Sequence, residues 1–211
     1  MLTATYWKPV FTYIRLRWNA SEQDAEDLTQ DFFSSAFEKE FLVRYDAGRA
    51  RFRTFLRTCV DHMVMNAAKA SSRAKRGGGT TAVPLDALSS DDAAFVADAS
   101  SDEMDELFRQ EWIRSVFEQA VDRLRAECQS TGKGVQLAIF EKYDVVGPSS
   151  TPPSYASLAT EHGVPETQVT NYLAFARRRL RHHVLETLAA LTATDEELAA
   201  EAREILGVEI P

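Results

Sequence analysis

Residues 154–181 read SYASLATEHGVPETQVTNYLAFARRRLR, an order of residue types that predicts two helices separated by a tight turn. Ser154 can cap the start of the first helix, and Leu158 gives that helix an inner face. Gly163 supplies the turn, because glycine adopts the required backbone conformation at the lowest cost. Pro165 begins the next helix, where its missing N–H costs nothing. The apolar side of that second helix consists of Val169, Leu173, Ala176 and Leu180.

This pattern is typical of a helix–turn–helix unit, whose second helix enters the major groove of DNA. Polar residues at the start of that helix would face base edges, and arginines at its far end would meet phosphates. The polar residues are Glu166, Thr167, Gln168, Thr170 and Asn171, and the arginines are Arg177, Arg178, Arg179 and Arg181. A plain helical hairpin with solvated arginines is the alternative, but the order and spacing of these signals favour DNA binding.

The whole chain has 211 residues, a formal net charge of -8 and 27% charged residues, which excludes collagen-like and wholly disordered classes. No apolar run approaches the roughly 20 residues of a membrane helix, and the N-terminus lacks the pattern of a secretory signal. Cys59 and Cys128 lie far apart, which favours a reducing cytoplasm over a disulfide framework. Because the four histidines show no ligand spacing with either cysteine, we expect no metal site and no cofactor.

Charge is distributed unevenly along the chain. Residues 77–106 carry 8 acidic and no basic groups and open with Gly77, Gly78 and Gly79, a composition typical of a solvated linker. An acidic strand that lies in a basic channel of a partner is the sharper alternative. We therefore expect one domain at 1–76, a flexible acidic linker at 77–106, a second domain at 107–190 and an acidic extension at 191–211.

Helical spacing of apolar residues dominates the sequence, whereas alternating strand patterns are almost absent. Helices are expected over residues 5–18, about 21–41, about 52–70 and about 107–129, besides the two helices described first. The predicted fold class is all-α, with two helical domains joined by the acidic linker.

The predicted helix after Ser21 carries an acidic ridge. Asp24, Asp27 and Asp31 are three and four residues apart and therefore lie on one helix face. Glu26 and Gln30 add polar groups beside it. A solvated helix face is the simplest interpretation of this pattern taken alone.

A third feature combines basic and aromatic residues. Arg49, Arg51, Arg53 and Arg57 flank Phe52, and Lys69 and Arg73 extend the positive run. Such a mixture suits single-stranded DNA, because the cations follow the backbone while rings stack on unpaired bases. Phe55 is expected in the core, and Phe52 is the better candidate for contact with a base.

These three features, in this order, resemble the bacterial RNA polymerase sigma factors of the sigma-70 class, in the extracytoplasmic-function (ECF) group. The acidic helix Asp24–Phe33 is similar to region 2.2, residues 52–66 to region 2.3, and residues 154–181 to region 4.2. The likeness spans about residues 20–185. The extension beyond about residue 190 has no counterpart in minimal ECF factors.

The resemblance implies a role for each feature. Region 2.2 binds core RNA polymerase, region 2.3 captures the melted minus-ten element, and region 4.2 reads the minus-thirty-five element as duplex. The residues implied for polymerase binding are Asp24, Glu26, Asp27, Gln30 and Asp31. Those implied for minus-ten DNA are Arg49, Arg51, Phe52, Arg53, Arg57, Asn66, Lys69 and Arg73. Those implied for minus-thirty-five DNA are Glu166, Thr167, Gln168, Thr170, Asn171, Arg177, Arg178, Arg179 and Arg181.

The partners implied are core RNA polymerase and promoter DNA, with an anti-sigma factor or another regulator left open and no membrane insertion. Two other functions stay open. One is a helix–turn–helix regulator that acts without polymerase, and the other is a helical adaptor that binds protein through Asp195–Leu206. An enzyme is least favoured, because Gly77, Gly78 and Gly79 lack the Lys-Ser/Thr of a phosphate-binding loop.

Overall fold

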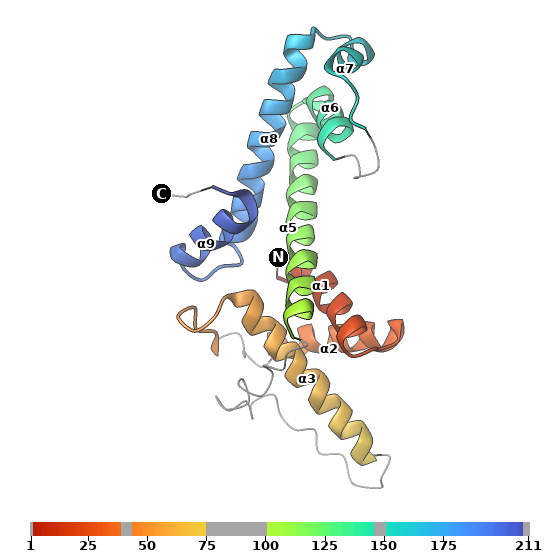
Figure 1. Ribbon diagram of the computed structural model, residues 1–211, viewed down its shortest axis with the longest axis vertical. Coiled ribbons are helices and arrows are strands. Elements are labelled where there is room, and N and C mark those ends of the chain that lie inside the picture. The colour runs from red at the N-terminus through yellow and green to blue at the C-terminus, as the bar shows by residue number, and fades with distance from the viewer. Residues whose placement is uncertain (1, 39–43, 75–100, 146–150, 209–211) are drawn as a thin grey trace. The chain divides into compact units, whose positions relative to one another are not determined.

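The computed structural model describes residues 2–38, 44–74, 101–145 and 151–208, which form helices and no strands (Figure 1). The expected all-α fold is thereby confirmed. The helices are α1 (Leu2–Arg17), α2 (Glu22–Glu38), α3 (Phe52–Ala74), α5 (Ser101–Ser130), α6 (Gly134–Asp144), α7 (Tyr155–His162), α8 (Glu166–Ala189) and α9 (Asp195–Leu206).

The chain divides into two compact units. Unit 1 comprises residues 1–115 and 191–200, and unit 2 comprises residues 116–190 and 201–211. Both α5 and α9 contribute residues to each unit. We describe each unit separately.

Unit 1 is built on α1, which packs against α2 and α3. Val10 and Ile14 of α1 are fully buried with Phe32 of α2 and Leu56 of α3, as their three- and four-residue spacing requires. Trp7 of the same pattern is only half-buried, and its ring stacks on Phe33 at a centroid distance of 5.7 Å. The apolar stripes of three helices thus form one core.

Helix α5 begins at Ser101, earlier than the expected start near residue 107. The sequence placed its first residues in the expected linker. Asp102 and Glu103 lie in the first turn of the helix, where the helix dipole favours negative charge. Phe108 and Trp112 are buried in unit 1 and stack on Tyr6 at 6.4 Å each. The start of α5 is therefore part of the first compact unit, whereas residues 77–100 of the expected linker lie outside the described residues.

Unit 2 packs α6 and α7 against α8. Its core consists of Leu124, Cys128, Leu137, Ile139, Phe140, Leu158, Val169, Leu173 and Ala176. These side chains come from α6, α7, α8 and the second half of α5. The apolar side expected for the helix after Pro165 is therefore the side that is buried.

The turn between α7 and α8 has the expected local chemistry. Ser154 caps α7, with its Oγ accepting a hydrogen bond from the Ser157 N–H at 3.1 Å. Gly163 adopts a φ of 64°, the left-handed conformation that glycine tolerates best. Pro165 occupies the N-cap of α8, so the helix begins at Glu166, one residue later than expected. Neither at the N-cap nor at the first helical position would the backbone N–H be needed for a hydrogen bond within the helix, so proline is tolerated at both.

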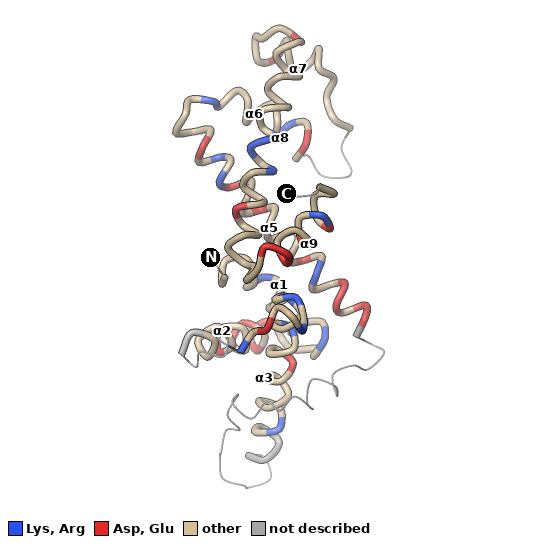
Figure 2. Tube along the Cα trace, turned by 90° about the vertical axis from the view of Figure 1, so that its left-hand side faces the viewer, with Lys and Arg blue, Asp and Glu red and all other residues tan. Residues whose placement is uncertain are grey.

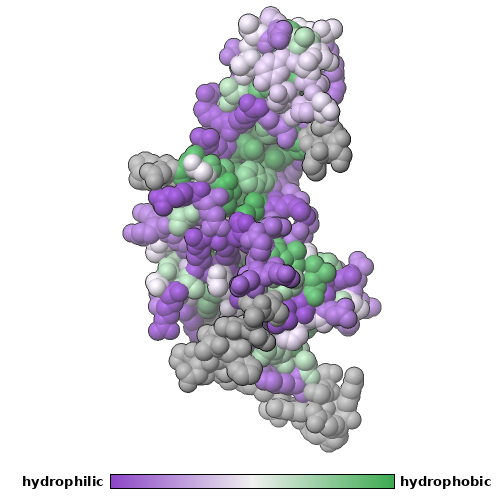
Figure 3. Space-filling model, viewed as in Figure 1, coloured by the Kyte–Doolittle hydropathy of each residue, from purple (hydrophilic) through white to green (hydrophobic). Residues whose placement is uncertain are grey.

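Large apolar side chains are rarely exposed in the described ranges. Those that are exposed are Leu16, Val135 and Val145. On the face seen in Figure 3, hydrophobic residues lie in patches between hydrophilic ones. None of the helices described is both long and apolar enough to span a bilayer.

Candidate functional site

The acidic ridge lies on the exposed side of α2. Ala25, Thr29, Phe32, Phe33 and Ala36 of this helix are buried. The opposite side carries Asp24, Glu26, Asp27, Gln30 and Asp31, all of which are exposed. Figure 2 marks the acidic residues along α2 in red. The helix is therefore divided cleanly into a core side and an acidic side.

Ser21 fixes the start of this helix. The Asp24 N–H donates to Ser21 Oγ at 3.1 Å, and the Ser21 hydroxyl donates to the Asp24 carboxylate at 2.6 Å. In the part of the chain that the structure describes, Asp27 and Asp31 form no hydrogen bond or ion pair through their carboxylates. Their charges remain available to a basic partner surface.

The basic and aromatic segment lies in the loop before α3 and in the first turns of α3. The side chain of Arg49 is 79% exposed and pairs with Asp46 at 3.3 Å. Arg51 and Arg53 are half-buried, and the Arg53 guanidinium lies over the Trp112 ring at 5.1 Å. Further along α3, Asn66 is half-buried and Lys69 is exposed, while the side chain of Arg73 lies outside the described residues.

Phe52 belongs to an aromatic cluster. Its ring centroid lies 5.1 Å from Tyr45, 5.8 Å from Tyr6 and 6.3 Å from Phe55. Both Phe52 and Phe55 are half-buried, although Phe55 was expected in the core. The cluster holds Phe52 in a fixed orientation at the N-terminus of α3.

Arg57 is placed differently from the other arginines of this segment. It is only 8% exposed, and its guanidinium contacts the Tyr13 hydroxyl at 3.2 Å, Asp61 at 3.1 Å and Asp105 at 2.7 Å. Burial, followed by the Asp61 charge, raises the pKa of Tyr13 to about 12. Arg57 therefore connects α1, α3 and α5 within unit 1. The sequence placed Arg57 among the residues that contact minus-ten DNA, but its guanidinium is buried and already paired.

This internal network was not recognised from the sequence. Its signal is Asp61, an acidic residue one position beyond the apolar Cys59 and Val60 and four residues after Arg57. A carboxylate buried among apolar neighbours needs a partner. The spacing of Arg57 and Asp61 supplies one on the same helix face.

In unit 2, the first turns of α8 present a polar surface. Glu166, Thr167, Gln168, Thr170 and Asn171 are all exposed. The Gln168 side chain accepts a hydrogen bond from the Tyr172 hydroxyl at 2.8 Å, which orients its amide. The expected base-facing residues therefore share one accessible end of α8.

The four arginines of α8 fall into two classes. Arg177 makes a two-pronged ion pair with Asp144, at 2.9 and 2.8 Å, and Arg179 pairs with Glu127 at 2.8 Å. Arg178 and Arg181 are exposed and, among the residues described, form no ion pair. Two of the four arginines expected to contact phosphates are thus paired with carboxylates inside unit 2, and the other two are available to DNA.

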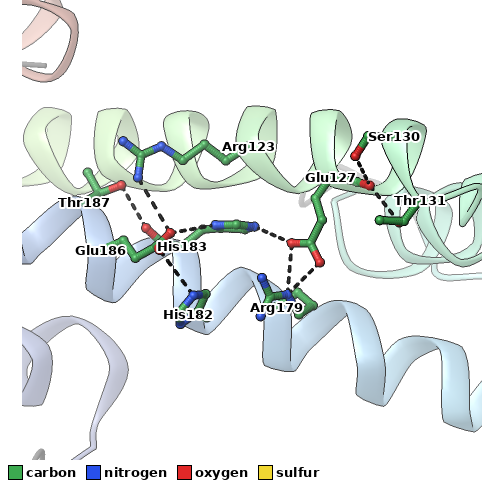
Figure 4. Close-up of polar contacts among 9 residues, drawn as sticks. All are labelled: Arg123, Glu127, Ser130, Thr131, Arg179, His182, His183, Glu186 and Thr187. Atoms are coloured by element: carbon green, nitrogen blue, oxygen red, sulfur yellow. Dashed lines mark hydrogen bonds and ion pairs between the residues drawn. The ribbon is translucent and has the colours of Figure 1, made fainter.

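The Arg179 contact belongs to a polar network between α5 and α8 (Figure 4). One ring nitrogen of His183 lies 2.8 Å from Glu127, and the other lies 3.0 Å from Glu186. Arg123 approaches Glu186 at 3.9 Å. His183 is buried, so this network fixes the two long helices of unit 2 against each other.

Comparison with known proteins gives one family match. Residues 4–74 match the family model of Sigma-70 region 2. The matched residues run from within α1 to the end of α3 and include both the acidic side of α2 and the basic segment. Searches of curated proteins and of solved structures gave no significant match. Residues 4–74 of the chain therefore form a domain of the sigma-70 region 2 type.

Proposed function

We propose that this protein is an RNA polymerase sigma factor of the ECF group, with a C-terminal extension. It binds core polymerase in the cytoplasm, recognises promoter DNA and opens it, and it acts by binding rather than as an enzyme. The observation that carries the proposal is the exposed acidic side of α2 inside the residues that match Sigma-70 region 2.

Polymerase docking is assigned to α2. Its buried side anchors the helix to unit 1, so the acidic side projects as a rigid surface. Opposite charges on the partner steer the encounter and fix its register. In the sigma-70 class, the corresponding helix binds the clamp coiled coil of the largest polymerase subunits.

Capture of the melted minus-ten strand is assigned to the start and outer face of α3. The residues proposed are Arg49, Arg51, Phe52, Arg53, Asn66, Lys69 and Arg73. Arginines would follow the strand's phosphates while flipped bases stack on aromatic rings, which offsets an unstacking cost of a few kcal/mol. Arg57 is left out of this set because its guanidinium is already held by Tyr13, Asp61 and Asp105.

Recognition of the minus-thirty-five duplex is assigned to α7 and α8, acting as a helix–turn–helix. The polar first turns of α8 enter the major groove, and Arg178 and Arg181 contact the backbone. The domain limits expected from the sequence are proposed with one change, because helix α5 begins at Ser101 and residues 101–106 are therefore not part of the linker. Mounted together on polymerase, two modest DNA contacts gain by effective concentration.

The proposal is tested by co-purification with core polymerase and by run-off transcription on a genomic library. Asp27→Lys with Asp31→Lys reverses the acidic side without touching the Ser21–Asp24 cap. We expect this variant to lose most of its polymerase binding and promoter-dependent transcripts. The matched control, Asp195→Lys with Glu196→Lys, makes the same charge change on exposed residues of α9 and should bind as the wild type does.

Two results would reject the proposal. One is a wild-type chain that neither binds core polymerase nor supports initiation. The other is a double variant of α2 that binds polymerase as well as the control does.

A regulator that acts without polymerase is the second candidate. The observation in its favour is that the exposed polar residues and free arginines of α8 lie in unit 2, outside the region 2 match. Tight footprinting of duplex DNA by the free protein would support it.

A further inference from the structure

Glu197 of α9 is in contact with the start of α3 within unit 1. Its Oε1 accepts a hydrogen bond from the Phe52 N–H at 2.7 Å and another from the Tyr45 hydroxyl at 2.7 Å. Glu197 is only 8% exposed. A carboxylate from residues 191–200 therefore occupies the N-terminus of the helix that carries the proposed minus-ten interface.

The second carboxylate oxygen serves the helix to which Glu197 belongs. Oε2 accepts from the Ala193 N–H at 3.0 Å, and the Glu197 N–H donates to Thr194 Oγ1 at 3.2 Å. This is close to a capping box, which stabilises the start of α9. The capping role accounts for Oε2 but not for the two hydrogen bonds to Oε1.

The chemistry at Oε1 is that of an anion site. The N-terminus of an α-helix carries a partial positive charge and unpaired N–H groups that bind carboxylates and phosphates alike. Within the described ranges, Glu197 forms no ion pair with a lysine or arginine. The buried carboxylate is therefore stabilised by the Phe52 N–H, the Tyr45 hydroxyl and the dipole of α3.

We propose that residues 191–200 form an autoinhibitory segment, in which Glu197 occupies the place of a backbone phosphate of the melted promoter strand. This inference rests on the proposed function of the α3 N-terminus. The neighbours of the contact fit a nucleic-acid backbone, because Arg49, Arg51 and Arg53 surround Phe52 in the sequence.

The inference makes a gain-of-function expectation. A strand must displace Glu197 before it binds. The apparent affinity is therefore the intrinsic affinity multiplied by the fraction of molecules in which the site is open. Weakening the contact should therefore strengthen DNA binding, whereas loss of a purely structural contact should leave it unchanged or reduce it.

The experiment measures binding of a labelled single-stranded oligonucleotide of random sequence to the full chain, without polymerase. Glu197→Gln removes the charge and leaves one accepting oxygen, which can still accept from the Ala193 N–H of the cap while the amide NH2 replaces the other oxygen. Tyr45→Phe removes one donor and keeps the ring. We expect each variant to bind about threefold to tenfold more tightly than the wild type. Glu196→Gln, an exposed neighbour on the same turn, should match the wild type. Unchanged or weaker binding by both Glu197→Gln and Tyr45→Phe overturns the inference.

A second measurement covers the case in which a variant folds poorly. Amide hydrogen exchange of the wild-type chain is followed across residues 193–200 and at Phe52, with and without the oligonucleotide. Binding at one site that excludes Glu197 must loosen the contact in return. We therefore expect faster exchange across 193–200 when the oligonucleotide is bound, and equal exchange would contradict the inference.

These tests separate the two proposals. Neither the oligonucleotide titration nor the exchange measurement uses polymerase. Failure of the sigma-factor proposal is seen in the separate co-purification experiment, as a wild-type chain that does not bind core polymerase. Failure of the autoinhibitory inference appears as unchanged oligonucleotide binding and exchange in a chain that does bind it.

Discussion

At the scale of single residues, arginines only eight positions apart lie in different surroundings. Arg49 is exposed and pairs only with Asp46 among the contacts described here, whereas Arg57 is buried with two carboxylates and a tyrosine hydroxyl. A surface ion pair contributes about 0–1 kcal/mol to stability, whereas removing one partner of a buried pair costs about 3–5 kcal/mol. Arg57 therefore has a structural role, whereas Arg49 is accessible for the DNA contact proposed for it.

We predict that Arg57→Ala lowers the free energy of unfolding by about 3 kcal/mol, because it leaves Asp61 buried without its cation. Arg49→Ala should change stability by less than about 0.5 kcal/mol and weaken oligonucleotide binding instead. Urea denaturation and oligonucleotide titration of both variants test this. Equal stability of the two variants would show that Arg57 is not part of the core network.

The network in Figure 4 makes a prediction for pH dependence. Burial raises the pKa of Glu127, but hydrogen bonds from Arg179 and His183 outweigh it, so the pKa is lowered overall. A hydrogen bond from His183 likewise lowers the pKa of Glu186. A carboxyl whose pKa is lowered in the folded state stabilises the fold at pH values above its ordinary pKa of about 4.3. This contribution disappears as the pH falls through the lowered pKa.

Glu127→Gln should therefore destabilise the protein most near neutral pH and progressively less in acid. Thermal denaturation of the wild type and the variant from neutral pH into acid measures this difference. Glu166→Gln, an exposed change on α8, should shift the midpoint by a constant small amount. A Glu127→Gln effect that stays constant with pH would contradict the role given to Glu127.

At the scale of helices, α2 and α8 each divide into a buried and an exposed side. In α2 the buried side includes Phe32 and the exposed side includes Asp27, as an amphipathic helix requires. In α8 this division does not by itself show which arginines are paired with carboxylates and which are available to DNA. Arg177 and Arg178 are both exposed, yet only Arg177 has a carboxylate partner among the residues described.

We predict different effects for the two arginine pairs of α8. Arg178→Ala with Arg181→Ala should weaken promoter-duplex binding and reduce the slope of log affinity against log salt by about 1 for each lost phosphate contact. Arg177→Ala with Arg179→Ala should mainly reduce stability, by about 1 kcal/mol or more. A salt series of duplex titrations with the polymerase-bound protein, together with urea denaturation, measures both. Identical behaviour of the two variants would contradict the division.

At the scale of the whole molecule, the formal net charge of -8 opposes DNA, whose phosphates dominate nonspecific affinity. The cations proposed to bind DNA occupy short segments of unit 1 and unit 2. Each segment alone should bind weakly. High affinity should arise only when a larger partner holds both modules on one template.

We predict that core polymerase increases the apparent affinity of the protein for a promoter duplex by about 10²-fold or more, through effective concentration. Fluorescence anisotropy with a fragment identified by run-off transcription measures this at one fixed salt concentration. The fragment with its minus-thirty-five element scrambled is the control and should show a much smaller increase. Equal affinity with and without polymerase would favour the regulator alternative.

Most of the helices, and the caps at Ser21 and Ser154, follow from the sequence, because they depend on residues three or four positions apart. The first turns of α5 are the exception, since they lie in the expected linker. Ser154, Gly163 and the apolar side of α8 have the local roles that their order predicts. The same holds for the acidic side of α2, since the helical period that buries Phe32 exposes Asp27.

What the sequence could not decide is which charged groups are already paired. Arg179 meets Glu127 across 52 positions, and the Phe52 N–H meets Glu197 across 145. No periodicity links residues so far apart, and only the packing of whole helices brings them within hydrogen-bond distance. Local chemistry thus set the elements and their faces, whereas tertiary contacts determined which of those charges remain available to a partner.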